Sequence, residues 1–164
     1  YKISKIIKKN ENVVEIGGGL GRTAYYCNLF GIKDYTIVDI PITFLAQGNY
    51  LGRAISEKNI IFENELGKKY EKNKIKLITP EFFLKSKTKY SLAFTCDSLT
   101  EVNYDLAFDY MKKISKSKYL LSINHEKNSF NISKLIEIFK HKNYSRNLYW
   151  LRKGYVEEFV NFKN

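Results

Sequence analysis

The fold of this chain is decided by residues 13–22, which read VVEIGGGLGR. A mostly apolar run over residues 12–16 predicts a buried strand, and a glycine-rich turn follows it directly. The turn opens a predicted helix over residues 23–30, which Gly31 closes as a C-cap. Glycine permits positive φ and close approach to a ligand, and a helix N-terminus adds free N–H groups. The stretch therefore predicts a ligand-binding turn, with a tight turn that binds nothing as the alternative.

The spacing of the glycines excludes two familiar phosphate-binding patterns. A dinucleotide fingerprint needs glycine at the first, third and sixth positions, and the sixth position counted from Gly17 is Arg22. A Walker A loop needs Gly-Lys followed by Ser or Thr, which this stretch lacks. The spacing that holds is Gly17-x-Gly19-x-Gly21, with Glu15 two residues before the first glycine.

Short apolar runs alternate with amphipathic stretches along the rest of the chain. Further strands are predicted over residues 35–40, 74–78, 90–96 and 118–124, and 60–62 is a competing strand within the ambiguous stretch 57–73. Helices are predicted over 42–54 after Pro41, over 102–114, and through Ile132, Leu135, Ile136 and Phe139. This alternation predicts an α/β fold: a Rossmann-like, doubly wound, mostly parallel sheet of about seven strands.

The C-terminal part of the chain has a different pattern. Residues 147–151 and 155–162 are aromatic-rich runs joined at 152–154, which predicts an antiparallel hairpin. Its aromatic side chains, Trp150 among them, are expected to pack on the sheet. His141 is expected late in the preceding helix, on a solvated surface.

Length and composition bound the class of protein. The 164 residues predict one domain, and because the chain begins at Tyr1 rather than Met we expect upstream residues to be missing. No apolar run is longer than four residues, so no membrane partner is expected. Cys27 and Cys96 lie in largely apolar stretches, which predicts reduced thiols and a cytoplasmic protein.

The net charge of +11 points first to a nucleic-acid partner. Only four of the 28 basic residues are arginine, however, and nucleic-acid readers usually rely on arginine for paired and stacking contacts. We therefore interpret the excess as solvated lysine and do not expect nucleic acid to be the partner. A basic nucleic-acid-binding module remains the alternative, although it leaves the glycine loop without a purpose.

The segment from Glu15 to Gly21 resembles motif I of class I S-adenosylmethionine-dependent methyltransferases. Asp39, 18 residues after Gly21, matches the acid that this family uses on the ribose hydroxyls. A carboxylate can accept two hydrogen bonds from a cis-diol, which is a reason independent of the resemblance. The resemblance implies S-adenosylmethionine as the cofactor, with these cofactor-binding residues: Glu15, Gly17, Gly18, Gly19, Gly21, Asp39, Thr79 near the adenine, and Asp97 at the methionine part.

Three further blocks resemble the sugar O-methyltransferase family: residues 35–41 (YTIVDIP), 97–102 (DSLTEV) and 119–126 (YLLSINHE). Asp97 and Val102 stand where that family is expected to have Asn and Met. The resemblance implies a small-molecule partner with a sugar or glycan hydroxyl as the methyl acceptor. A methyltransferase acting on RNA is the alternative, but those that modify base nitrogens often carry paired prolines after the fourth strand, and this chain has none there.

Titratable side chains follow two predicted strands at the edge where open α/β sheets bind ligands. His125 is the expected general base, because histidine exchanges protons near neutral pH. Glu101 is expected to orient the acceptor or to serve as the base instead. The alternatives are a strand-end histidine satisfied by its neighbours and an acid at a helix start. Asp97, Glu101 and Glu126 together are a candidate magnesium site, because magnesium takes oxygen ligands.

Overall fold

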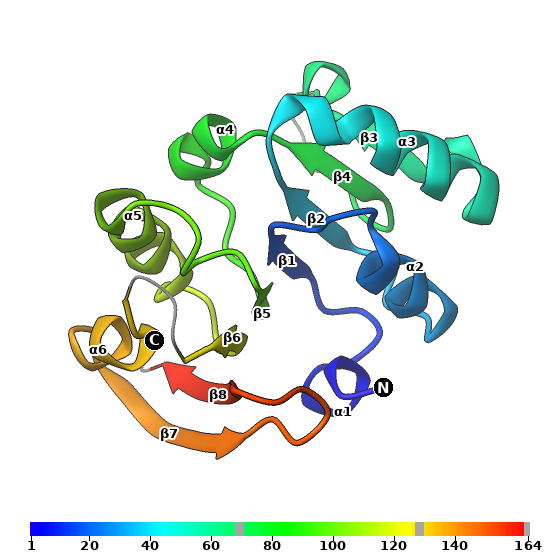
Figure 1. Ribbon diagram of the computed structural model, residues 1–164. Helices are drawn as coiled ribbons and strands as arrows, with labels where there is room; N and C mark the ends of the chain where they lie inside the picture. The colour runs from blue at the N-terminus through cyan, green and yellow to red at the C-terminus, as the bar shows by residue number, and fades with distance from the viewer. Residues whose placement is uncertain (68–70, 127–129, 163–164) are drawn as a thin grey trace. The chain divides into compact units, whose positions relative to one another are not determined.

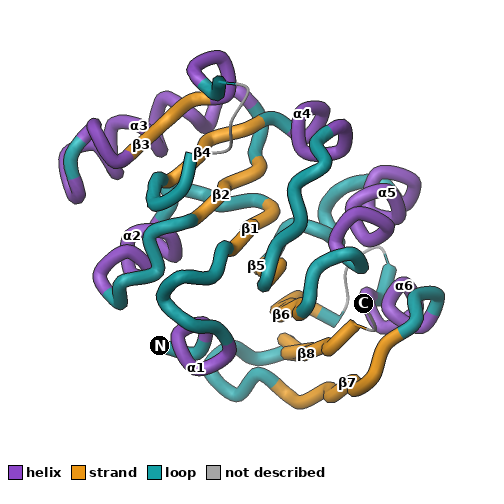
Figure 2. Tube along the Cα trace, turned by 180° about the vertical axis from the view of Figure 1, so that it is seen from behind, coloured by secondary structure: helices purple, strands orange, loops and turns teal. Residues whose placement is uncertain are grey.

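The computed structural model describes residues 1–67, 71–126 and 130–162, and the chain divides into two compact units, Tyr1–Lys87 and Thr88–Asn164. Figure 1 labels the elements of both units, and Figure 2 gives the same trace from behind. Each unit alternates strands with helices.

The first unit is built on four parallel strands in the order β3-β4-β2-β1. Its elements are α1 (Ile3–Ile6), β1 (Val13–Ile16), α2 (Arg22–Leu29), β2 (Tyr35–Val38), α3 (Pro41–Ile55), η1 (Glu57–Asn59), β3 (Ile60–Phe62), η2 (Glu63–Glu65), β4 (Ile75–Ile78) and α4 (Pro80–Lys85). Every residue of β1, β2 and β4 is buried, as expected of parallel strands covered on both faces. Helices α2 and α3 lie on one side of these strands and α4 on the other (Figure 1).

The second unit joins a parallel pair of strands to an antiparallel hairpin. Its elements are β5 (Leu92–Cys96), α5 (Tyr104–Ile114), β6 (Tyr119–His125), α6 (Ile132–Glu137), β7 (His141–Leu148) and β8 (Tyr155–Phe162). Strand β5 runs parallel to β6, whereas β8 pairs antiparallel with both β6 and β7. Helix α5 begins where the Asn103 side chain accepts the Leu106 N–H at 2.9 Å, and it buries Ala107, Met111 and Ile114 against the unit.

The predicted fold class is confirmed: the strands are mostly parallel, alternate with helices, and end in an antiparallel hairpin. Pro41 is the first residue of α3, as predicted. The described residues form eight strands rather than about seven, because the competing run 60–62 is β3. Part of the ambiguous stretch 57–73, residues 68–70, lies outside the described residues.

The glycines that weakened the prediction of α3 have a packing reason. A Cβ on Gly48 would lie 2.8 Å from Cζ of Phe62, the last residue of β3. A Cβ on Gly52 would lie 3.1 Å from Cγ of Glu57. Helix α3 therefore accepts a helix-propensity cost of about 1 kcal/mol for each glycine, in exchange for close contact with the segment that follows it.

The C-terminal predictions were wrong in detail. Helix α6 ends at Glu137, and His141 begins β7, half-buried, with Nδ1 2.9 Å from the carbonyl oxygen of Phe139. The first strand of the hairpin is therefore His141–Leu148 and not 147–151. Trp150 lies in the turn with 87% of its surface exposed, so it does not pack on the sheet. Polar residues dominate β7 because it pairs on one side only, as an edge strand, and exposes most of its side chains.

Within the part of the chain that the structure describes, we find no helix with both the length and the apolar character needed to cross a bilayer.

Candidate functional site

The glycine loop after β1 has the backbone that its sequence predicts. Gly17, Gly19 and Gly21 have φ values of 75°, 54° and 84°, in the left-handed region that disfavours other residues. A Cβ on Gly18 would lie 2.4 Å from the Ile37 side chain, so this position also requires glycine. At Gly19 a Cβ would meet nothing within 4 Å, which leaves bare backbone at the surface of the loop.

Asp39 follows β2 directly, and three neutral donors hold its carboxylate. Oδ2 accepts the Gly18 N–H at 3.1 Å, and Oδ1 accepts the Ile40 N–H at 2.9 Å. The third donor is Nε2 of Gln47, 2.9 Å from Oδ2. The structure therefore brings the strand-end acid against the glycine loop and holds it by dipoles rather than by a countercharge.

Gln47 is a residue of this site that sequence reasoning missed. It is fully buried on α3, and its Nε2 also donates to the Gly19 carbonyl oxygen at 2.9 Å. One amide thus connects the loop to Asp39. The sequence carries little signal for it: Gln47 is the single glutamine of the chain and stands four positions before Leu51, but Asn49 and Arg53 are polar residues of the same helix.

Glu15 lies on β1, beneath the loop. It is 3% exposed, and its Oε2 accepts the Tyr35 hydroxyl hydrogen at 3.0 Å. Burial raises the pKa of Glu15 to about 7, and the hydrogen bond from Tyr35 opposes this shift in part.

Thr79 follows β4 and caps α4 by accepting the Phe82 N–H at 3.2 Å. Its own hydroxyl donates to Oε2 of Glu63 at 2.7 Å, and its backbone N–H donates to the same oxygen at 2.6 Å. Thr79 is therefore engaged with Glu63 from the neighbouring η2 segment, which no sequence pattern indicated.

In the second unit, Asp97 follows β5 with φ of 52°, a conformation that aspartate tolerates better than most residues. Its Oδ2 accepts from the Arg152 guanidinium at 2.5 Å. Arg152 also lies 3.7 Å above the Tyr155 ring and donates to the Tyr155 hydroxyl. A cation therefore holds Asp97, and it comes from the turn that joins β7 to β8.

His125 ends β6 beside the same turn. Its ring meets the Tyr155 ring edge-on at 5.1 Å between centroids. A Cβ on Gly154, whose φ is 82°, would lie 2.6 Å from Nε2 of His125, so the turn needs glycine to pack on the imidazole. The structure thus places His125 and the Asp97–Arg152 pair around Tyr155. Glu101 is exposed in the turn before α5, where its N–H donates to the Ser98 carbonyl oxygen at 3.0 Å.

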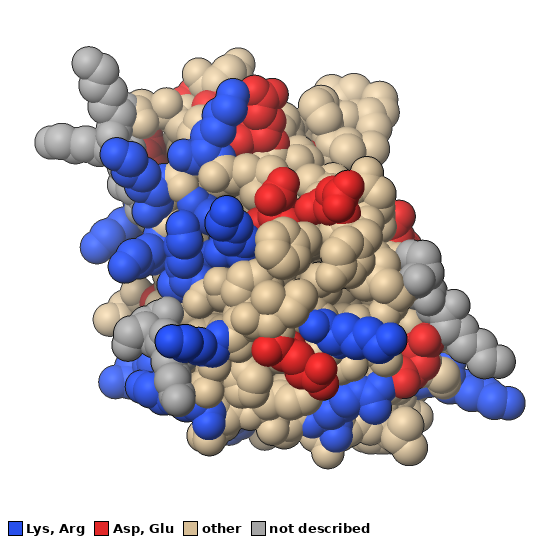
Figure 3. Space-filling model, turned by 90° about the vertical axis from the view of Figure 1, so that its left-hand side faces the viewer, with Lys and Arg blue, Asp and Glu red and all other residues tan. Residues whose placement is uncertain are grey.

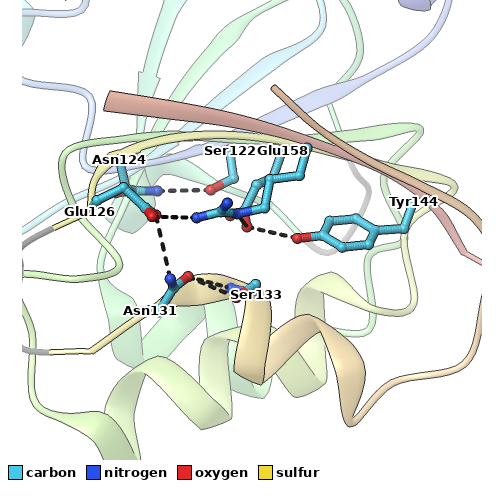
Figure 4. A network of polar contacts seen from close by, with 8 residues as sticks. Ser122, Asn124, Glu126, Asn131, Ser133, Tyr144 and Glu158 are labelled. Atoms are coloured by element: carbon cyan, nitrogen blue, oxygen red, sulfur yellow. Dashed lines mark hydrogen bonds and ion pairs between the residues drawn. The ribbon is translucent and has the colours of Figure 1, made fainter. Parts of the chain in front are cut away.

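Glu126 belongs to a polar network that joins β6, β7, β8 and the start of α6 (Figure 4). It pairs with Arg146, whose Nε lies 3.5 Å from Oε1 of Glu158. Glu158 is buried and accepts the Tyr144 hydroxyl hydrogen at 2.9 Å, and burial raises its pKa. Glu126 therefore completes a structural network.

The structure does not gather the proposed magnesium ligands. Among residues 1–67, 71–126 and 130–162, no group of three His, Cys, Asp or Glu side chains could hold a metal ion. Asp97 and Glu126 instead pair with separate arginines, Arg152 and Arg146. A guanidinium competes for the same carboxylate oxygens that a magnesium ion would need.

Comparison with known proteins identifies the fold. No protein-family model matches the chain, and no curated protein matches it in sequence. Among solved structures, the methyltransferase domain of bacterial CtHen1 is similar with a TM-score of 0.67 at 11% identity, covering 98% of this chain and 94% of that one. A TehB-like S-adenosylmethionine-dependent methyltransferase from Corynebacterium glutamicum has a TM-score of 0.67 at 12% identity, and the match covers 98% of this chain and 85% of that one. A candidate RNA methyltransferase, PH1948 from Pyrococcus horikoshii, has a TM-score of 0.59 at 14% identity, and the match covers 99% of this chain and 79% of that one. The chain therefore has the Rossmann-like fold of class I S-adenosylmethionine-dependent methyltransferases.

Proposed function

We propose that this protein is an S-adenosylmethionine-dependent methyltransferase that methylates a hydroxyl group, with a sugar or glycan as the acceptor. The observation that carries the proposal is the carboxylate of Asp39, held against the glycine loop by the Gly18 N–H and by Gln47. The fold of the solved relatives supports the class of activity. The resemblance of residues 35–41, 97–102 and 119–126 to sugar O-methyltransferases supports the acceptor.

The residues of the first unit fit the cofactor. Asp39 carries a negative charge with no cationic partner in its three hydrogen bonds, so it suits a hydroxyl group of a ribose. Gly19 presents backbone without a side chain, which lets a ligand approach the loop. The assignments of Thr79 to the adenine and of Asp97 to the methionine part remain proposals from the resemblance.

When bound, the cofactor supplies an electrophilic methyl group on a sulfonium. His125 takes the hydroxyl proton, and its contacts with Gly154 and Tyr155 fix the orientation of the ring. Glu101, exposed in the turn before α5, orients the acceptor. Positioning supplies most of the acceleration of such an in-line displacement.

A second candidate acceptor is RNA. Basic side chains gather on part of the surface in Figure 3. Separately, the sequence places four lysines at or just after the end of α5: Lys112, Lys113, Lys116 and Lys118. One of the solved relatives is itself described as a candidate RNA methyltransferase. We favour the sugar because lysine, rather than arginine, makes up most of the basic surface.

Calorimetric titration with S-adenosylmethionine, S-adenosylhomocysteine and NAD tests the cofactor. We expect micromolar binding of the first two and none of NAD. Absence of binding by all three would overturn the proposal.

Transfer of a radiolabelled methyl group to a panel of sugars and to RNA then tests the acceptor. Label on the sugars that is insensitive to salt supports the favoured reading. Label on RNA that falls steeply as salt is raised would replace it.

A further inference from the structure

We propose that Gln47 is a positioning residue of the cofactor site: it holds the glycine loop and Asp39 in one arrangement, so that Asp39 reads a single ribose hydroxyl. The inference rests on the proposed function, because it concerns the same site. It adds a residue from α3 to a site that motif comparison assigns to the loop and the strand end alone.

The first observation is how α3 uses its buried face. Only Gln47 and Leu51 are buried among the 15 residues of this helix, and they lie one turn apart on the same side. Gln47 donates to the Gly19 carbonyl oxygen. Leu51 packs on Gly21, where an added Cβ would lie 2.9 Å from Cδ1 of Leu51. The buried face of α3 therefore contacts the glycine loop at two points.

The second observation is that the Gln47 amide makes two hydrogen bonds in the site and leaves its own oxygen buried without a partner among the described residues. Nε2 of Gln47 donates to the Gly19 carbonyl oxygen and to Oδ2 of Asp39, both at 2.9 Å, which uses both of its hydrogens. This orientation buries Oε1 with no hydrogen-bond partner among the described residues. An unpartnered buried acceptor is unfavourable, and an apolar side chain would avoid that cost. Stability alone therefore does not account for glutamine at this position.

The hydrogen-bond capacity of Asp39 gives the consequence. A carboxylate offers about four acceptor positions, two on each oxygen. Gly18 and Gln47 occupy those of Oδ2, and Ile40 occupies one on Oδ1. The position left for a ligand is on Oδ1, so one hydroxyl of the ribose is bound by Asp39 and the other is not.

The test is calorimetric titration of the full chain with S-adenosylhomocysteine and its 2′-deoxy and 3′-deoxy analogues. For the wild type we expect one analogue to bind roughly tenfold more weakly and the other within about twofold. Gln47→Met keeps the length of the side chain and removes both donors. We expect this variant to bind S-adenosylhomocysteine roughly five- to tenfold more weakly and to distinguish the two analogues less, because the carboxylate is free to turn.

Gln47→Glu gives a signature that a purely structural role would not produce. Its protonated carboxyl can donate to Asp39, whereas its ionised form repels it. The affinity of this variant for S-adenosylhomocysteine, relative to the wild type at the same pH, should therefore fall as the pH is raised. If Gln47→Met does not fold, this ratio decides the question by itself.

Thr36→Val is the matched control. Thr36 is buried on β2, three residues before Asp39, and its hydroxyl has no hydrogen-bond partner among the described residues. Removing that hydroxyl should leave the affinity unchanged and the stability unchanged or higher.

Two failures are distinguishable. If the wild type does not bind S-adenosylhomocysteine, the proposed function and this inference fall together. If the wild type binds it and the folded Gln47→Met variant binds all three ligands as the wild type does, only this inference is overturned. A pH-independent ratio for Gln47→Glu would overturn it as well.

Discussion

Asp39 and Asp97 each follow a buried parallel strand directly, yet the chain surrounds them differently. Asp39, in the first unit, is held by two backbone N–H groups and an amide, all of them neutral. Asp97, in the second unit, is paired with the guanidinium of Arg152, which itself stacks on Tyr155. Neutral donors fix the position of a carboxylate and leave its charge for a ligand, whereas a guanidinium fixes the position and cancels the charge.

The difference suggests separate roles in the proposed reaction: Asp39 binds the cofactor, and His125 accepts the proton of the acceptor. At the strand ends of the first unit, a carboxylate with neutral donors suits the proposed binding of an uncharged hydroxyl group. The strand ends of the second unit place His125 among Tyr155, Gly154 and an ion pair, which suits the handling of a proton. Four predictions test this division, from the largest expected effect to the smallest.

Replacing His125 with alanine should reduce turnover by about 10²- to 10⁴-fold and leave the affinity for S-adenosylhomocysteine within about twofold, because a general base acts on the acceptor. Single-turnover methyl transfer and calorimetry measure the two effects. His141→Ala, at the other histidine of the chain, is the control and should change neither. Loss of cofactor affinity in His125→Ala would place the imidazole at the cofactor and break the division.

Glu15→Gln should stabilise the protein by about 3 kcal/mol at pH 8 and by little at pH 4. The folded carboxyl has a pKa of about 7, against 4.5 for a solvated glutamate, so between these values the folded state binds more protons than the unfolded state. Stability contributed by this group is therefore lost as the pH rises, and glutamine removes the loss. Urea unfolding at the two pH values measures it.

The exposed acid Glu57 is the matched position for that experiment, and Glu57→Gln should shift stability little at either pH. An equal effect of Glu15→Gln at pH 4 and pH 8 would show that the titration of Glu15 is not the cause.

Asp39→Ala should weaken binding of S-adenosylmethionine by roughly tenfold or more, because the charge-assisted hydrogen bond to the ribose is lost. Calorimetric titration measures the change. Asp105→Ala, at an exposed acid in the first turn of α5, controls for the loss of one negative charge. Equal affinities for the Asp39→Ala variant and the wild type would mean that the strand-end acid does not touch the cofactor.

Arg152→Gln should lower the free energy of unfolding by less than about 1 kcal/mol, because both side chains of its ion pair with Asp97 are partly exposed. The shift in the urea midpoint measures it. A cost above about 2 kcal/mol would show that the pair anchors the hairpin turn more firmly than its exposure indicates.

Local patterns were enough to predict most of the strands, the glycine loop and the acid after β2. Buried parallel strands are short apolar runs, and residues 13–16 and 35–38 meet that description directly. The boundary between α6 and β7 could not be predicted in the same way. Residues 141–148 are largely polar, and their strand is defined by pairing with β8 rather than by their own periodicity.

The polar contacts of the site depend on chain segments that lie far apart in sequence. Arg152 meets Asp97 across 55 positions, and Gln47 meets Gly19 across 28. Neither pair has a spacing that a sequence pattern encodes. The loop and Asp39 were predictable because their residue types are constrained by backbone geometry and ligand chemistry. Gln47 was not, because an amide bridging two acceptors leaves no motif.

The exposed turn between β7 and β8 carries an intrinsic fluorescent probe. Trp150 is the only tryptophan of the chain, it is 87% exposed, and it stands two residues from the arginine that pairs with Asp97. Its emission in the free protein should be that of a solvated indole. Any blue shift on adding an acceptor would then report contact at the turn beside His125, with no label to attach and no second tryptophan to subtract.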